Sequence, residues 1–244
     1  MAEQRTAIVT GAARRVGRAI ADALLADGWT VIAHIHHEGD EASAGAIKVV
    51  ADLESYDCAD PLFAAAEGLP PLRLLVNNAG RFAWDSMDQL DPGEFTRHMA
   101  VNARAPALLI QRFGALQDAV GDSLVVNILD AKLAAPNPDF LSYTVSKQAL
   151  AGLTELAARA LAPRGVRVNA VAPGLMLQSP GQSEENFERM HQHNLLRRGV
   201  SPDDVVGAIR YLIDARCVTG QTLILDSGQR FMGLTRDVQF MGEA

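Results

Sequence analysis

Tyr143 and Lys147 stand four residues apart and have the chemistry of a proton-donating pair. Side chains at positions i and i+4 of a helix share a face, so the phenol and the ammonium lie within reach of one another. A tyrosine hydroxyl titrates near a pH of about 10, and a neighbouring positive charge favours the phenolate and lowers that pKa. The pair therefore predicts general acid chemistry, whereas the alternative is an ordinary polar helix surface.

A second group of residues suits the binding of an anion. Gly11 and Gly17 flank the run Ala12-Ala13-Arg14-Arg15-Val16, between an apolar strand pattern and a helical pattern. Backbone amides at a helix N-terminus face the place where an anion sits. The glycine spacing differs from the GxGxxG fingerprint of long-chain dinucleotide-binding proteins. On the residues alone, the turn indicates either a phosphate site or close packing of a strand on a helix.

The periodicity of the chain predicts the scaffold that positions these residues. Short β-branched runs alternate with longer Ala- and Leu-rich helical patterns, which is typical of βαβ units and a parallel sheet. We expect seven strands, at Thr6–Thr10, Thr30–Ile35, Ile47–Asp52, Leu72–Asn77, Ser123–Leu129, Val166–Ala172 and Thr222–Leu225. We expect helices at Val16–Asp27, Asp57–Glu67, Pro92–Ala119, Phe140–Leu161, Glu184–Asn194 and Pro202–Ile213, and a short, weak one after Glu38. Asp91-Pro92 and Ser201-Pro202 are helix start signals.

The pattern runs through the whole chain without an internal repeat, a low-complexity tract or a Pro/Gly/Ser linker. We therefore expect one α/β domain over residues 1–244, a Rossmann-type doubly wound sheet of seven parallel strands with helices on both faces. In such sheets ligands bind outside the carboxyl ends of the strands. The polar, irregular stretch 174–199 follows the sixth strand, and we expect it to be a mobile substrate lid.

Composition narrows the function classes. Hydrophobic residues make up 48% of the 244 residues, enough to bury a core without disulfides or metals. A net charge of −7 attracts neither nucleic acid nor anionic lipid, so no such partner is expected and no metal is predicted. Two cysteines outside any CxxC pair indicate a reducing compartment. Without a basic-then-apolar leader or a long apolar run, we expect a soluble, cytoplasmic protein.

Further motifs extend the glycine turn and the Tyr/Lys pair across the chain. They are Asn77-Asn78-Ala79-Gly80 after the fourth strand, Asn102 on the next helix, Tyr143-Thr144-Val145-Ser146-Lys147 on the following one, and Pro173-Gly174 at the end of the sixth strand. With this order and spacing, the chain resembles the short-chain dehydrogenase/reductase family from Ile8 to Gly228. The resemblance implies that Tyr143 donates a proton, that Lys147 also holds the nicotinamide ribose, and that Asn102 supports a proton relay.

The resemblance also implies NADP(H) as the cofactor. NAD-dependent members carry an acidic residue at the end of the second strand, where this chain reads Ala33-His34-Ile35-His36-His37 with His34 at that position. Arg14 resembles the basic residue of NADP-dependent members and suits a phosphate, whereas the nearby Glu38 weakens this assignment. Asp52 resembles the residue that contacts the adenine ring, and its alternative role is a turn cap. The expected cofactor residues are Gly11, Arg14, Arg15, Val16, Gly17, His34, His36, His37, Asp52, Leu53, Asn78, Ala79, Gly80, Tyr143, Lys147, Pro173 and Gly174.

Two positions depart from the usual family pattern. Arg15 replaces the middle glycine of the turn TGxxxGxG, and Asp130 stands where the family has a serine 13 positions before the tyrosine. Together with the His-x-His run, these departures resemble the pteridine reductase branch. In that branch an aromatic residue two positions past the Asn-Asn-Ala-x motif stacks on the pterin, and Phe82 matches it. The implied substrate site comprises Arg15, Phe82, Asp130, Tyr143 and Leu175.

We therefore expect an NADPH-dependent oxidoreductase that reduces a C=N bond of a pterin, with Tyr143 as the proton donor. A carboxylate accepts hydrogen bonds from ring nitrogens and helps to deliver a proton, although Asp130 is alternatively an inert loop carboxylate. The alternative function is a carbonyl reductase acting on a ketone or 3-oxoacyl group, which Asp130 disfavours. A third is a non-catalytic cofactor-binding sensor, for which loss of Tyr143 or Lys147 is expected.

The family resemblance also implies an assembly. Members are commonly homotetramers through the two long helices, here Pro92–Ala119 and Phe140–Leu161. Thr235-Arg236 resembles a C-terminal arginine that reaches the site of a neighbouring subunit in pteridine reductases. The small-molecule substrate and further copies of the chain are thus the expected partners.

Overall fold

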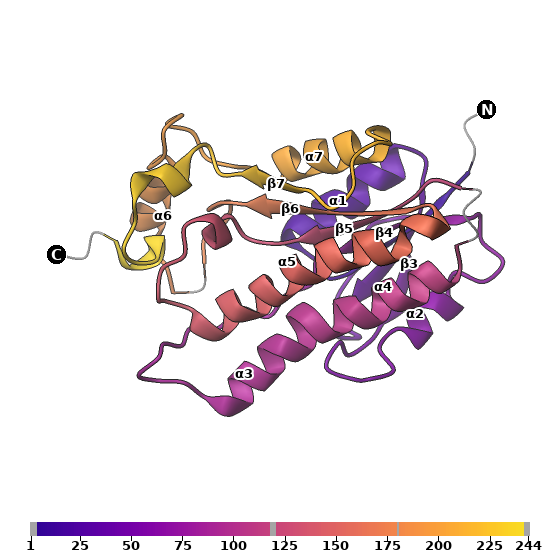
Figure 1. Cartoon of the computed structure of the whole chain (residues 1–244), viewed down its shortest axis with the longest axis horizontal. Helices are drawn as coiled ribbons and strands as arrows, with labels where there is room; N and C mark the ends of the chain where they lie inside the picture. The colour runs from indigo at the N-terminus through magenta and orange to yellow at the C-terminus, as the bar shows by residue number, and fades with distance from the viewer. Residues whose placement is uncertain (1–3, 118–120, 180, 242–244) are drawn as a thin grey trace.

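Seven parallel strands form the sheet of the computed structural model, which describes residues 4–117, 121–179 and 181–241 (Figure 1). The strands are β1 (Thr6–Val9), β2 (Thr30–Ile35), β3 (Ile47–Val50), β4 (Leu72–Asn77), β5 (Ser123–Ile128), β6 (Val166–Pro173) and β7 (Thr222–Leu225). Their order is β3-β2-β1-β4-β5-β6-β7, so the direction of winding reverses between β1 and β4. The predicted Rossmann-type fold is confirmed, and no strand boundary differs from its prediction by more than two residues.

Helices cover both faces of this sheet (Figure 1). On one face lie α1 (Arg15–Ala26) and α7 (Pro202–Asp214), and on the other α2 (Asp60–Ala64), α4 (Ala105–Ala115) and α5 (Leu141–Leu161). Each helix turns an apolar stripe to the strands. The core on the first face contains Ile20 and Leu24 of α1 and Ile209 and Leu212 of α7. The core on the second face contains Phe63 of α2 and Leu109 and Phe113 of α4. Removing this apolar surface from water is the main force that holds the layers together.

The long helix predicted over Pro92–Ala119 is interrupted. α3 (Pro92–Met99) is followed by a π-helical segment, Ala100–Arg104, before α4 begins. In a continuous α-helix the amide of residue 106 bonds to the carbonyl of residue 102, but Pro106 has no N–H to donate. Such π segments often occur at functional sites, and Asn102 lies in this one. α4 ends at Ala115, and the predicted end at Ala119 lies outside the described residues.

The short helix predicted after Glu38 is wrong. In the structure residues 36–46 form bends and turns, because Gly39 disfavours a helix and Gly45 has a φ of 89°. α2 is also shorter than predicted, and α6 (Glu184–His191) ends before Asn194.

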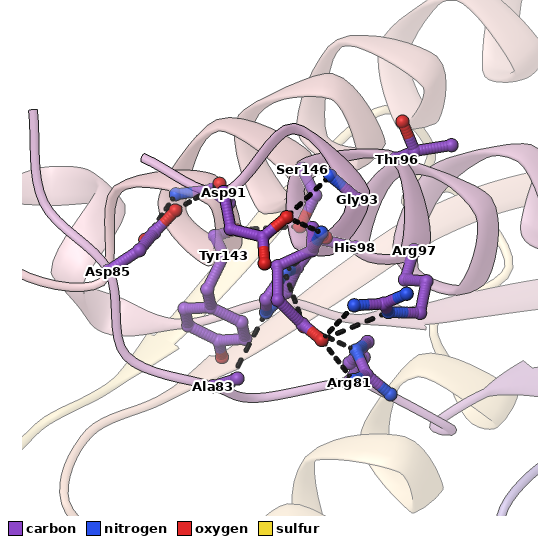
Figure 2. Close-up of polar contacts among 12 residues, drawn as sticks. Arg81, Ala83, Asp85, Asp91, Gly93, Thr96, Arg97, His98, Tyr143 and Ser146 are labelled. Carbon is purple, nitrogen blue, oxygen red and sulfur yellow. Dashed lines mark hydrogen bonds and ion pairs between the residues drawn. The ribbon is translucent and has the colours of Figure 1, made fainter. Parts of the chain in front are cut away.

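Both helix start signals are confirmed. The Asp91 carboxylate accepts hydrogen bonds from the Gly93 and Glu94 amides at the start of α3 (Figure 2), and Ser201 forms a capping box with Asp204 at the start of α7. Along the described segments, no helix has both the length and the apolar character to cross a bilayer.

Candidate active site

A cavity of about 760 Å³ lies at the carboxyl ends of the strands, where parallel sheets bind their ligands. Residues that follow six successive strands of the sheet line it, namely Gly11, His36, Asp52, Asn78, Asp130 and Gly174. Every site residue predicted from the sequence lines this cavity except Asn102. The sheet thus brings together residues that are widely separated in the chain.

The glycine turn is packed too closely for side chains at its two glycines. A Cβ atom on Gly17 would lie 2.1 Å from the Gly11 carbonyl oxygen, and one on Gly11 would lie 2.9 Å from the Cα atom of Ala79. The side-chain amide of Asn78 donates to the carbonyls of Thr10 and Gly11 at 2.9 and 3.3 Å. These contacts hold the amides at the start of α1 beside the cavity, as an anion site requires.

His34 joins this turn to the residue after β3 through two hydrogen bonds of its ring. Its Nδ1 accepts a hydrogen bond from the Gly11 amide at 3.0 Å, so the proton is on Nε2, which donates to the Ala51 carbonyl at 3.1 Å. Burial lowers the pKa of His34, and the ring is therefore neutral. His34 still lines the cavity, and its contact with a cofactor stays a prediction, but it supplies no positive charge to a phosphate.

Three other basic side chains, Arg14, His36 and His37, are exposed at this end of the cavity. The centroids of the two imidazole rings lie 4.1 Å apart, and the His36 Nε2 lies 4.0 Å from the Asp52 carboxylate. The same carboxylate accepts a hydrogen bond from the Glu54 amide at 2.8 Å, so Asp52 does serve as a turn cap. This end of the cavity thus presents an arginine and two imidazole rings toward any anion.

Tyr143 and Asp130 form the polar centre of the other end. The Tyr143 hydroxyl donates a 2.9 Å hydrogen bond to one carboxylate oxygen of Asp130, and the second oxygen accepts from the Lys132 amide at 2.8 Å. Burial raises the pKa of Asp130. Burial and the Asp130 charge together hold the pKa of Tyr143 well above its usual range. The predicted lowering of this pKa by Lys147 is therefore wrong here, because the carboxylate opposes it, and the phenol is protonated at neutral pH.

Lys147 lies one helical turn along α5 from Tyr143. Its ammonium donates a 2.7 Å hydrogen bond to the Ile128 carbonyl at the end of β5 and lies 5.9 Å from the centroid of the Tyr143 ring. Burial lowers the pKa of Lys147 to about 8. The amine is thus still largely protonated at neutral pH and can donate further hydrogen bonds into the cavity.

Asn102 lies behind the cavity wall. Its side-chain NH₂ donates to the Arg81 carbonyl at 3.0 Å and to the Ser146 hydroxyl at 2.9 Å, while its oxygen accepts from the Arg81 amide at 2.8 Å. The Ser146 hydroxyl in turn donates to the Tyr143 carbonyl at 2.7 Å. Asn102 therefore links the loop after β4 to α5, and its part in a proton relay stays a prediction.

Phe82 lines the cavity beside the ring of Tyr143. The residue is 38% exposed, which does not fit the alternative of a loop anchor under the core. One stacked contact joins it to Phe140, with centroids 4.3 Å apart, and it meets the Tyr143 ring edge-on at 4.8 Å. Trp84, two residues further on, instead packs edge-on against Phe240.

Arg15 occupies the left-handed region at a φ of 54°, the conformation that favours the glycine usual in the family pattern. Its guanidinium donates a 3.1 Å hydrogen bond to the Gln178 carbonyl, in the segment predicted as a lid. Leu175, Met176 and Leu177 of that segment line the cavity. The described start of the segment is therefore part of the cavity wall, and the mobility of the lid stays a prediction.

Residues near the C-terminus form a part of the wall that was not predicted from the sequence. Leu234, Asp237 and Val238 line the cavity, and the Asp237 carboxylate lies 3.4 Å from the Lys132 ammonium. The neighbouring Arg236 forms two hydrogen bonds with Asp139, at 2.8 and 2.9 Å, within the same chain. The sequence signal here was Thr235-Arg236, which predicted contact with the site of a neighbouring subunit, and no apolar period placed the segment against the sheet.

Comparison with known proteins agrees with this geometry. A family model described as enoyl-(acyl carrier protein) reductase matches residues 11–230. Pteridine reductase 1 of Leishmania tarentolae is 31% identical in sequence over 91% of this chain and 95% of that protein. The chain belongs to the short-chain dehydrogenase/reductase family. Both the family and the pteridine reductase-like branch predicted from the sequence are confirmed.

Two solved structures of family members resemble the chain closely. FolM alternative dihydrofolate reductase 1 from Brucella suis, in complex with NADP, has a TM-score of 0.89 and 38% sequence identity, and the match covers 95% of this chain and 97% of that one. The angucycline C-6 ketoreductase LanV with bound NADP has a TM-score of 0.81 and 29% identity, with 93% and 96% covered. This fold thus occurs both in a dihydrofolate reductase and in a ketone reductase.

Proposed function

We propose that the protein is an NADPH-dependent reductase that acts on a C=N bond of a pterin. The observation that carries the proposal is the hydrogen bond from the Tyr143 hydroxyl to Asp130 at the cavity wall, beside the exposed ring of Phe82. A carboxylate accepts hydrogen bonds from the amino and N–H groups of a pterin and exchanges a proton with the phenol. The similarity to pteridine reductase 1 and to the alternative dihydrofolate reductase supports the same substrate class.

The residues at the other end of the cavity fit NADP(H). The turn at Gly11 and Gly17 leaves no room for a Cβ atom and presents helix amides to a pyrophosphate. Arg14, His36 and His37 suit the additional phosphate of NADPH, and Lys147 suits a ribose hydroxyl. The remaining cofactor residues in this proposal are Arg15, Val16, His34, Asp52, Leu53, Asn78, Ala79, Gly80, Tyr143, Pro173 and Gly174. When bound, NADPH supplies the hydride for the reduction.

The chain's own residues handle the substrate and the proton. Tyr143 holds a proton at neutral pH and delivers it to the ring nitrogen next to the carbon that is reduced. Asp130 accepts hydrogen bonds from the substrate, Phe82 stacks on the flat ring, and the proton that Tyr143 gives up is replaced from solvent. Arg15 and Leu175 complete the substrate wall. Asn102, through Ser146, holds the backbone of Tyr143 in place and supports the relay of protons from solvent.

The test is the oxidation of NADPH by the wild-type protein with a panel of dihydropterins, quinonoid dihydropterin, dihydrofolate and simple ketones. We expect a pterin to be turned over with a higher kcat/KM than any ketone. Turnover of ketones with no turnover of any pterin would instead favour a carbonyl reductase, the class to which the angucycline ketoreductase belongs. A protein that binds NADPH and reduces nothing in the panel would favour a sensor.

We also propose a closed homotetramer in the cytoplasm. The outer face of α3, α4 and α5 has a shallow hollow lined by small and apolar residues, including Met99, Ala103, Ala107 and Leu153, which suits helix packing against another copy. The net charge of −7 and the two free cysteines, Cys58 and Cys217, favour a reducing compartment without nucleic-acid or membrane partners. Light scattering at micromolar concentration tests the assembly, and a monomer would reject it.

A further inference from the structure

Asp85 is a buried carboxylate that the proposed chemistry does not use, and it lies at the start of α5. One of its oxygens accepts a 2.9 Å hydrogen bond from the Ser142 amide, and the other accepts from the Ser142 hydroxyl. The helix has no local cap, because its N-cap residue, Phe140, makes no side-chain hydrogen bond. The helix that carries Tyr143 is therefore capped by a residue 57 positions away from Ser142 in the sequence.

The loop that carries Asp85 also carries Phe82, and it is held along its length. The Arg81 guanidinium donates two hydrogen bonds to Glu94, at 2.6 and 2.8 Å, and the Ala83 amide donates to the His98 ring at 3.2 Å. Figure 2 shows this loop running from Arg81 past Ala83 to Asp85, with Tyr143 beside it. Each of these contacts restricts where Phe82 can lie.

Aromatic contacts complete the link between the loop and the helix. The Phe82 ring stacks on Phe140, the N-cap residue of α5, and meets the Tyr143 ring edge-on. Phe140 has a φ of 53°, so the backbone just before the helix is held in a conformation unfavourable for a bulky residue. The Phe82 ring packs against this residue, and the hydrogen bonds from Ser142 to Asp85 hold the first turn of the helix that follows it.

We propose that Asp85 is a positioning residue that fixes the ring of Phe82 and the hydroxyl of Tyr143 relative to each other. This inference rests on the proposed function, in which Phe82 contacts the substrate and Tyr143 gives the proton. Removing the carboxylate leaves two buried Ser142 donors without their acceptor and frees the first turn of α5 to shift. A displacement of about 1 Å at reacting groups can cost about 100-fold in rate.

Two substitutions at Asp85 separate position from charge, and Asp204 offers a matched control. Asp85→Ala removes both acceptors, whereas Asp85→Asn removes the charge and keeps an oxygen for the Ser142 amide. At the start of α7, on the other face of the sheet, one carboxylate oxygen of Asp204 accepts hydrogen bonds from the amide and the hydroxyl of Ser201 in an exposed contact. Asp204→Ala therefore removes a helix-terminal contact away from the cavity.

The experiment measures kcat, KM for a reduced pterin and Kd for NADPH, below the melting temperature of each variant. We expect Asp85→Ala to lower kcat by about 10- to 100-fold and to raise the pterin KM, with the Kd for NADPH within about twofold of wild type. Asp85→Asn recovers most of the loss, and Asp204→Ala leaves kcat unchanged. A kcat within about twofold of wild type for Asp85→Ala, or equal losses for the alanine and asparagine variants, would overturn the inference.

Two further measurements cover the cases in which Asp85→Ala does not fold or the wild type reduces no pterin. Should Asp85→Ala fail to fold, Ser142→Ala removes only the hydroxyl half of the contact, with an expected loss of about threefold to tenfold in kcat. Should the wild type reduce ketones and no pterin, the proposed function fails by itself. The Asp85 variants are then measured with a ketone, where Tyr143 still gives the proton and the same loss of kcat is expected. An unchanged kcat in that assay would overturn the role of Asp85.

Discussion

The two ends of the cavity are built in different ways. The cofactor end lies at the glycine turn around Gly11, and the substrate end lies at Tyr143 and Asp130. At the cofactor end the key contacts are imposed by the sheet, since Asn78 and His34 stand on or just after neighbouring strands and bond to the glycine turn at Gly11. At the substrate end, side chains from segments outside the sheet meet. The Arg15 guanidinium donates a hydrogen bond to the Gln178 carbonyl, and the Asp139 carboxylate accepts one from Arg236, near the end of the chain.

This difference explains why one fold accommodates several substrates. The strand order determines which loops meet at the carboxyl edge of the sheet, so the cofactor end has the same position wherever this fold occurs. Contacts between loops depend on single side chains, and they change without disturbing the sheet. The substrate must therefore be argued from residues such as Asp130 and Phe82, and not from the fold.

The largest expected effect comes from removing the proton donor at the substrate end. Tyr143→Phe keeps the ring that packs on Phe82 but loses the hydroxyl, so kcat should fall by about 100- to 10,000-fold. NADPH binding should stay close to wild type, because the lost interaction matters in the transition state. Steady-state kinetics and a fluorescence titration with NADPH measure the two quantities. Retention of most activity would show that another group gives the proton.

A smaller effect is expected from removing a charge at the cofactor end. Arg14→Ala should raise the KM for NADPH by about 10- to 100-fold and change the KM for NADH little, since NADH lacks the additional phosphate. Arg18→Ala is the matched control, because this nearby arginine instead pairs with Asp22 and the Glu41 carbonyl. Equal use of NADPH and NADH by the wild type would contradict the assignment of Arg14.

The smallest effect is a pH dependence of stability at the substrate end. The Arg81 guanidinium lowers the pKa of Glu94 to about 2, with help from Arg97. A carboxyl whose pKa is lower in the folded state stabilises the fold above its ordinary pKa, and this contribution is lost as the pH falls through its folded value. Glu94→Gln should therefore cost about 1 kcal/mol of unfolding free energy near neutral pH, and this difference should shrink between about pH 4.5 and pH 2.

Urea unfolding of both proteins across that pH range measures the difference. Glu155→Gln serves as a control, because Glu155 pairs with Arg159 on the exposed face of α5, where an ion pair contributes little to stability. A pH-independent difference for Glu94→Gln would mean that packing, and not the ion pair with Arg81, holds the Phe82 loop.

The sheet and most of the cofactor end could be predicted from the sequence. Alternating apolar runs located every strand, and the carboxyl ends of parallel strands then had to meet at one edge. The interruption of the helix at Asn102 could not be predicted from periodicity, because the apolar pattern continues through the π-helical segment. It follows from Pro106, whose missing amide removes one α-helical hydrogen bond.

At the substrate end the sequence predicted the residues but not what holds them. Tyr143, Asp130 and Phe82 were found by type and position, yet the resulting pKa of Tyr143 depends on burial and on the nearby carboxylate. The cap that Asp85 gives to α5 follows no local motif, since a cap normally stands next to its helix. The hydrogen bond from Arg236 to Asp139 joins residues 97 positions apart, so it likewise follows from no local pattern.

If Asp130 adapts the cavity to a pterin, then Asp130→Ser should change the preference between pterin and ketone substrates. The measurement is kcat/KM for a reduced pterin and for a simple ketone, with NADPH, in the wild type and the variant. We predict that the ratio of the pterin value to the ketone value falls by at least about tenfold, because the serine hydroxyl replaces an acceptor of pterin N–H groups with a donor suited to a ketone oxygen. An unchanged ratio would contradict the account.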